Sequence, residues 1–177
     1  MDSIVENKNG SFHQITRYTI SNDKIQKIEI SSPQNILIEK YEFTYNGDVL
    51  TQFTTFKSTS LGNFNATTDI SYNGGNPTSA LTSGTMGLFA FSTTSTLTFD
   101  DKYTPFHNVA TIENPIAAKH NIITSEATTD LGTSTITSTS TYTYTYNNDN
   151  FPISDTYENN NNGTISTGSD EFVYENK

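Results

Sequence analysis

The chain has 177 residues and a formal net charge of -10, from 9 basic and 19 acidic side chains. This length suffices for one domain with a buried core, and the acidic balance excludes the basic surface that nucleic acids require. It also disfavours docking on anionic membranes. The absence of Cys excludes disulfides and thiol catalysis. No apolar run reaches the roughly 18 residues of a transmembrane helix.

The composition favours an all-β fold. The sequence contains 31 Thr, 20 Asn and 19 Ser. Thr favours strands and Asn favours turns, whereas strong helix formers are scarce. The 10 Tyr and 11 Phe residues predict a core rich in aromatic rings, with tyrosine hydroxyls at its rim.

Residues 1–10 lack periodicity and are expected to form a disordered lead-in, followed by a single β-hairpin domain over residues 11–177. Within this domain, alternating stretches predict strands, and Asn, Asp and Gly clusters predict turns. Asn46-Gly47 is the strongest hairpin signal, because both residues accept the positive φ of a type I′ turn. The expected strands span residues 12–20, 24–30, 36–45, 49–57, 64–72, 77–81, 96–99, 121–128, 133–146, 153–158 and 164–174.

Strict alternation of Tyr and Thr over residues 141–146 places the two residue types on opposite faces of a strand. We expect the tyrosines to face the core, so that Tyr144 is much more buried than Thr143. The Thr array from Thr133 to Thr145 resembles the ice-binding surfaces of some β-solenoid proteins. We favour a solvated outer face instead, because the twist of a meander breaks the flatness that ice binding needs.

Two segments depart from the alternating pattern. Residues 105–119 are the only segment suited to a short helix, whose length Pro115 limits. Residues 84–91 are apolar, contain Gly and do not alternate, which predicts a flexible loop that closes the end of the core. The alternative is that this loop binds an apolar ligand or a partner. The residues of that site would be Met86, Leu88, Phe89 and Phe91.

Junctions at which the chain is expected to turn recur about 25 to 28 residues apart, with one gap of 47 residues. The residues before these turns are Ile20, Tyr45, Tyr72, Phe99, Tyr146 and Tyr174. A regular spacing of this size predicts a repeated hairpin. We therefore expect an antiparallel meander of about 10 to 12 strands, forming a twisted sheet or a barrel.

Several junctions resemble a family of Bacteroidetes envelope lipoproteins of unknown function that have YD-repeat-like hairpins. They are YNGD at residues 45–48, FDDKYTPF at 99–106, HNII at 120–123 and YNNDNFP at 146–152. The resemblance extends over roughly residues 12–177. It implies a porin-like antiparallel fold in an exported protein that is tethered through a lipidated N-terminal Cys. The present sequence has no Cys, and the family supplies no functional residues to transfer.

The sequence offers little support for catalysis or cofactor binding. The histidines, His13, His107 and His120, lack metal-ligand spacing. Neither a nucleophile elbow nor a phosphate-binding Gly loop is present. The oxygen-rich segments 100–101 and 147–150, and Asp155 together with Glu158, contain calcium-type ligands, but turn geometry already accounts for Asn and Asp in such segments. We predict no catalytic residue, metal or cofactor.

These observations lead to a first hypothesis of a non-enzymatic cell-envelope lipoprotein domain that binds or scaffolds. Its partner would be an envelope protein or an apolar or glycan ligand, and not nucleic acid. The chain would be exported, periplasmic or anchored at the outer membrane by an upstream lipid, without spanning the membrane. A surface adhesin or fibre-like β module is the alternative, and a glycan-acting enzyme, which needs two facing carboxylates, is the third.

Overall fold

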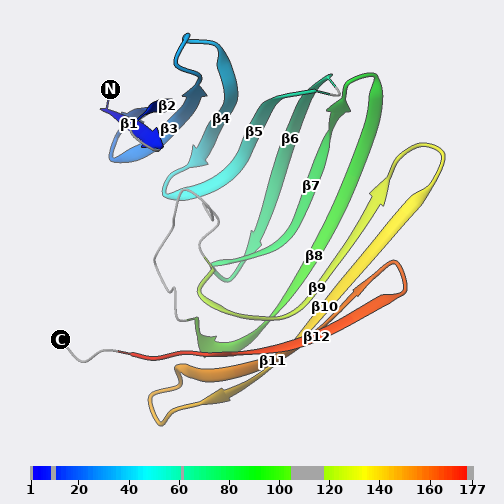
Figure 1. The fold of residues 1–177 in the computed structure, drawn as a ribbon. Coiled ribbons are helices and arrows are strands. Elements are labelled where there is room, and N and C mark those ends of the chain that lie inside the picture. The colour runs from blue at the N-terminus through cyan, green and yellow to red at the C-terminus, as the bar shows by residue number, and fades with distance from the viewer. Residues whose placement is uncertain (1, 9–10, 61, 105–117, 175–177) are drawn as a thin grey trace. The chain divides into compact units, whose positions relative to one another are not determined.

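The computed structural model describes residues 2–8, 11–60, 62–104 and 118–174. Over these residues it contains twelve strands, whose order in one sheet follows the order of the chain (Figure 1). The strands are β1 (Asp2–Lys8), β2 (Ser11–Ser21), β3 (Lys24–Ser31), β4 (Leu37–Asn46), β5 (Val49–Thr59), β6 (Gly62–Asn73), β7 (Asn76–Met86), β8 (Phe89–Tyr103), β9 (His120–Asp130), β10 (Thr135–Tyr146), β11 (Pro152–Asn161) and β12 (Thr164–Glu171). The predicted all-β antiparallel meander is confirmed. Because β1 and β12 are the two ends of the strand order, the sheet is open.

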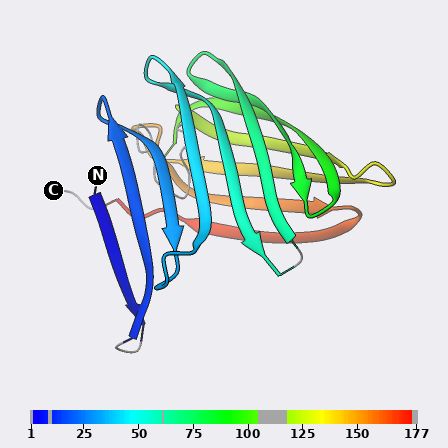
Figure 2. The same cartoon turned by 90° about the horizontal axis from the view of Figure 1, so that it is seen from above.

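Two expectations concern residues 105–119 and residues 1–10. The short helix predicted over 105–119 lies almost wholly outside the described residues. Residues 1–10 were expected to lack regular structure, whereas Asp2–Lys8 form β1 and pair antiparallel with β2 (Figure 2). This strand forms by pairing with β2, the next strand in the chain, although its own sequence shows no alternating pattern.

The chain divides into two compact units. Unit 1 comprises Met1–Asp69 and Thr82–Ser92, and unit 2 comprises Ile70–Leu81 and Thr93–Lys177. The divisions therefore fall within β6, β7 and β8. The prediction of a single domain over residues 11–177 stays a prediction.

In unit 1 the alternating pattern separates a buried face from an exposed one. In β4 the Phe43 side chain is buried, whereas Glu42 and Thr44 are exposed. Ile28 of β3, opposite Tyr41 in the register, is almost completely buried. Period-two alternation in the sequence therefore identified the buried face correctly.

The hairpin turns confirm the turn chemistry but correct its placement. Asn22 and Asp23 both have positive φ, as do Asn162 and Gly163, which is the pattern of a type I′ turn. At the predicted Asn46-Gly47 turn, only Gly47 has positive φ and Asn46 remains in β4. The tip therefore lies one residue further along, and a bulge beside Tyr45 absorbs the shift.

The expectation of an aromatic-rich buried core is wrong. The buried hydrophobic side chains among the described residues are Ile28, Phe43, Leu50, Ala66 and Ile70. Most rings are instead half-buried, and several of their hydroxyls donate to backbone carbonyls, as Tyr45 does to Ile25 and Tyr144 does to Ile122. A large ring on a single sheet layer lacks a second layer to cover it.

In unit 2 the Tyr–Thr alternation behaves as predicted. The tyrosines of β10 are half-buried and its threonines are exposed, so Tyr144 is more buried than Thr143. The threonines continue onto the neighbouring strands, where Thr124 lies opposite Thr141 and Thr156 lies opposite Thr143. The solvated Thr face is therefore wider than one strand.

The predicted strand end at 100–102 is wrong, because β8 continues to Tyr103. The Asp100 carboxylate does not sit in a turn. It accepts hydrogen bonds from the Asn121 backbone N–H (3.1 Å), the Asn121 Nδ2 (3.1 Å) and the Tyr146 hydroxyl. Burial, and after it this carboxylate, raise the pKa of Tyr146. Asp100 thus serves as a hydrogen-bond acceptor inside unit 2, whereas the exposed Asp101 pairs with Lys102.

Candidate functional site

Residues 84–91 form a tight hairpin rather than the predicted flexible loop. Gly84 and Met86 belong to the end of β7, and Phe89 begins β8. Between them the chain turns at Gly87-Leu88, with Gly87 at a φ of 62°. This positive φ is accessible to Gly without steric cost, so Gly87 allows the sharp reversal.

The side chains at the hairpin tip are exposed instead of closing the core. Leu88 is 99% exposed, Phe89 is 76% exposed and Met86 is 46% exposed. The favoured expectation that this segment completes the core is therefore wrong for these three residues. A cluster of large apolar side chains in water is a feature that soluble surfaces usually avoid. We call Met86, Leu88 and Phe89 the apolar tip.

The backbone below the apolar tip is held by the turn between β5 and β6. Gly87 donates a backbone hydrogen bond to the Asn63 carbonyl (2.9 Å). A Cβ on Gly62 would lie 2.9 Å from the Gly87 Cα, so the two turns are in direct backbone contact. Phe91, the fourth predicted site residue, stacks on Phe64 with ring centroids 5.5 Å apart. Phe91 thus supports the tip from within unit 1.

The sequence on either side of the apolar tip, and that of the adjoining turn, carries no formal charge. Residues 82–92 and 58–68, which supply the two adjoining turns and their strands, contain no Asp, Glu, Lys or Arg. These two segments are therefore uncharged, although the chain as a whole has a net charge of -10. Transfer of the tip from water to an apolar surface would therefore bury apolar area without desolvating a charged group. Desolvation of charged groups is the costly part of such a transfer.

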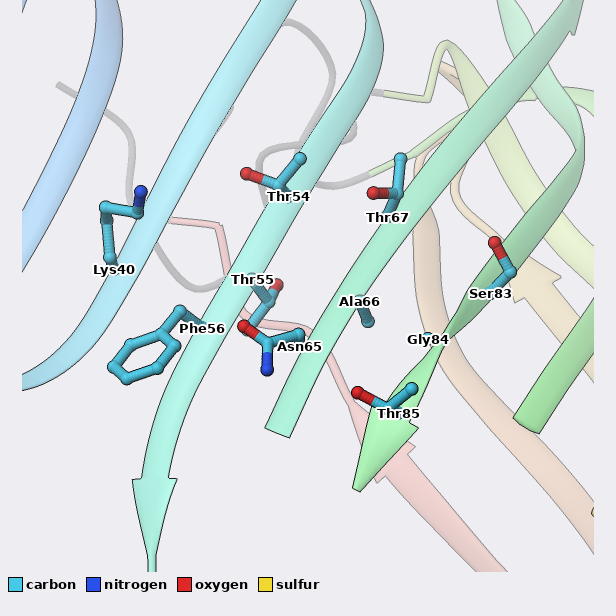
Figure 3. A pocket seen from close by; sticks show the side chains of 10 residues that line it. All are labelled: Lys40, Thr54, Thr55, Phe56, Asn65, Ala66, Thr67, Ser83, Gly84 and Thr85. Carbon is cyan, nitrogen blue, oxygen red and sulfur yellow. The ribbon is translucent and has the colours of Figure 1, made fainter. Parts of the chain in front are cut away.

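A shallow hollow of about 380 Å³ lies beside the tip strand (Figure 3). Its lining side chains are mostly hydroxyls, with the Asn65 amide among them, the Phe56 ring at one side and Lys40 as its cation. Lys40 is itself paired with Glu42 at 3.1 Å. The lining residues are Lys40, Thr54, Thr55, Phe56, Asn65, Ala66, Thr67, Ser83, Gly84 and Thr85. The apolar tip therefore adjoins a neutral, hydrogen-bonding surface.

Unit 2 contains a carboxylate in an unusual setting. Asp155 of β11 is 6% exposed, and its Oδ1 atom has no hydrogen-bond partner among the described residues. It lies between Tyr144 of β10 and Asp170 of β12 in the strand register. Burial, and after it the like charge of Asp170, raise the pKa of Asp155 above its usual value, while a backbone hydrogen bond from Asp170 opposes the shift.

This raised pKa predicts a specific pH dependence of stability. In the folded chain Asp155 binds a proton more readily than in the unfolded chain, so its contribution is most favourable below the unfolded pKa of 3.8. The contribution is lost as pH rises through the higher folded pKa. Asp155→Asn should therefore be at least as stable as the parent chain at pH 7, and its relative advantage should shrink towards pH 4. Urea unfolding across this range measures the effect, and Asp149→Asn, in an exposed turn, is the control; an equal pH slope in both variants would contradict it.

The polar residues that the sequence analysis considered as ligands do not assemble into a centre within the described residues. His13 is exposed, His120 contacts the Asn76 amide through its Nδ1 atom (3.0 Å), and His107 lies outside the described residues. Across the described ranges, no three His, Asp or Glu side chains converge as metal ligands. In the turn after β10, the Asn147 Oδ1 accepts backbone N–H groups of Asp149 and Phe151, which confirms a role in turn geometry.

The fold and the site together define an antiparallel all-β meander with an exposed apolar hairpin. No helix in the described part of the chain is both long and apolar enough to cross a membrane. Neither a protein-family model nor a curated protein sequence matches the chain. A similar solved structure is a porin-like protein from Bacteroides uniformis, with a TM-score of 0.54 and 17% identity, covering 94% of this chain and 73% of that one. At this identity the likeness shows the fold alone.

Proposed function

We propose that this chain is a non-enzymatic binding domain of the bacterial cell envelope, held against an apolar surface by the apolar tip. The observation that carries the proposal is the exposure of Leu88 and Phe89 on a hairpin without charges. The porin-like fold of the similar structure is compatible with an envelope setting. The surface that fits best is the interface of an uncharged, zwitterionic lipid bilayer, because the acidic chain repels anionic lipids.

The energetics of such a contact are modest. Burying a Leu or Phe side chain is worth roughly 1.5 to 3 kcal/mol each, so two of them suffice only for weak, reversible attachment. A single acyl chain likewise gives marginal binding, and stable anchoring takes two signals. The envelope-lipoprotein role proposed here would combine an upstream lipid tether with the apolar tip. The tether would fix the chain at the membrane, and the tip would orient it.

The double variant Leu88→Ser/Phe89→Ser tests the tip. We expect it to lose about 3 kcal/mol of partition free energy, roughly a hundredfold, in co-sedimentation with phosphatidylcholine vesicles. Its melting temperature should change little, because both side chains are already in water. Phe91→Ser is the contrasting variant: it removes the stack on Phe64 and should lower the melting temperature.

Three outcomes would contradict the proposal. A large fall in melting temperature for the double variant would mean that the tip completes the core in solution. Unchanged vesicle binding, or stronger binding to phosphatidylglycerol vesicles than to phosphatidylcholine vesicles, would exclude the tip as a neutral-lipid contact.

The adhesin or fibre-like alternative is favoured by a different observation, the end strands β1 and β12 of the open sheet, which could pair with other copies. Concentration-dependent assembly in size-exclusion chromatography would support it.

A further inference from the structure

A second surface lies in unit 2, on the face of β10, β11 and β12 opposite the exposed threonines. We call it the tyrosine–carboxylate surface. Its residues are Tyr142, Tyr144, Tyr146, Asp155, Tyr157 and Asp170. The register brings them together from three strands, which lie side by side in Figure 1. Tyr142 lies opposite Tyr157, and Asp155 lies between Tyr144 and Asp170.

The rings of this surface form a continuous aromatic row. The centroids of Tyr142 and Tyr144 are 6.3 Å apart, and those of Tyr142 and Tyr157 are 6.2 Å apart. Tyr157 leans across β12 over Gly168, where a Cβ would lie 2.4 Å from the Tyr157 Cζ. Gly168 thus leaves room for the ring to lie on the sheet. The row therefore presents aromatic rings beside the carboxylates.

Within the part of the chain that the structure describes, the carboxylates of this surface lack a positive partner. Asp155 and Asp170 are direct cross-strand neighbours with the same charge, a pairing that destabilises a sheet. No ion pair joins either of them to a cation within the described residues. Asp155 is nine-tenths buried and its Oδ1 accepts no hydrogen bond from those residues. A buried acceptor without a donor is costly, so the arrangement calls for a cationic donor.

We propose that the tyrosine–carboxylate surface binds an organic ammonium group, such as that of a polyamine or a lysine side chain. The ammonium N–H groups would donate to the Asp155 Oδ1 and separate the two like charges, while the tyrosine rings attract the cation through their π systems. A neutral sugar would satisfy the acceptor but leave the charge repulsion in place. This inference concerns unit 2 and stands independently of the apolar tip.

Spermidine is a suitable probe, and titration calorimetry of the full chain at about 0.15 M salt suppresses long-range attraction to the acidic protein. Asp155→Asn should weaken spermidine binding about tenfold, because it removes a charge-assisted hydrogen bond. Glu158→Gln is the matched control: Glu158 neighbours Tyr157 on β11, is exposed on the Thr face, and its replacement removes the same charge. It should change the affinity less than about twofold. Because the chain has no Trp, tyrosine fluorescence provides a second readout.

Each remaining outcome is decisive. Equal weakening by Asp155→Asn and Glu158→Gln would show diffuse attraction to an acidic chain and overturn the proposal. Binding of chitotriose that depends on Asp155, without spermidine binding, would assign the surface to neutral sugars. Calcium chloride binding that depends on Asp155 and is unaffected by Tyr157→Leu would assign it to a metal ion. Loss of spermidine affinity in both Asp155→Asn and Tyr157→Leu, with unchanged melting temperatures, is the result that we expect.

Discussion

Replacing Gly84 by Ala is expected to lower the free energy of unfolding by about 3 kcal/mol, the largest effect predicted for a single methyl group in this chain. A Cβ at Gly84 would lie 2.1 Å from the Asn65 carbonyl oxygen and 2.8 Å from the Ala66 Cα. These are backbone atoms of β6, which cannot withdraw without distorting the sheet. Urea unfolding monitored by circular dichroism measures the loss.

Gly168→Ala is the matched control for this prediction. Its new Cβ would also be too close to a neighbour, but that neighbour is the far end of the Tyr157 side chain. The ring can rotate away, so we expect a loss of only about 1 kcal/mol. Adding Tyr157→Ala to Gly168→Ala should remove this steric conflict. Equal losses for Gly84→Ala and Gly168→Ala would show that the backbone contact at Gly84 is not the constraint described above.

The second large effect is expected for Asn121→Ala, which should cost about 2 kcal/mol of unfolding free energy. The Asn121 side chain is 3% exposed, and its Nδ2 donates to Asp100 Oδ2 (3.1 Å) and to the Tyr103 carbonyl (3.2 Å). Removing this amide leaves a half-buried carboxylate with fewer donors. The carboxylate is then less well solvated by the protein than before.

Asn148→Ala provides the comparison, because Asn148 is exposed in the turn that follows β10. A surface change of this kind is expected to stay within about 0.5 kcal/mol. Thermal and urea unfolding of both variants test the difference. Similar stabilities for Asn121→Ala and Asn148→Ala would mean that water replaces the lost hydrogen bonds of Asp100 without cost.

The sequence predicted some residues of the candidate sites, but not whether their side chains are exposed. Composition alone drew attention to Met86, Leu88 and Phe89 as an apolar segment, but their exposure depends on the turn at Gly87-Leu88. The reason is that an apolar run without alternation has no preferred face, so the sequence cannot say whether the core or the solvent receives it.

The sequence pattern also predicted only some of the residues that form the tyrosine–carboxylate surface. Alternation grouped Tyr142, Tyr144 and Tyr146, but nothing local to these residues indicates Asp155 or Tyr157 as neighbours. Their positions depend on the register of β10 with β11, which a bulge beside Tyr146 shifts by one residue. A shift of one residue moves a whole strand face to the other side of the sheet, so such contacts follow from pairing rather than from pattern.

By itself, the sequence determined the fold class, most strand positions and the polar faces of β4 and β10, because these follow from period-two alternation and from turn-forming Asn, Asp and Gly. Only the tertiary structure decided that the apolar tip is exposed, that Asp100 serves Asn121 rather than a turn, and that Asp155 meets Asp170. Those contacts join residues far apart in the chain. Their formation depends on strand register and close packing, which local patterns do not encode.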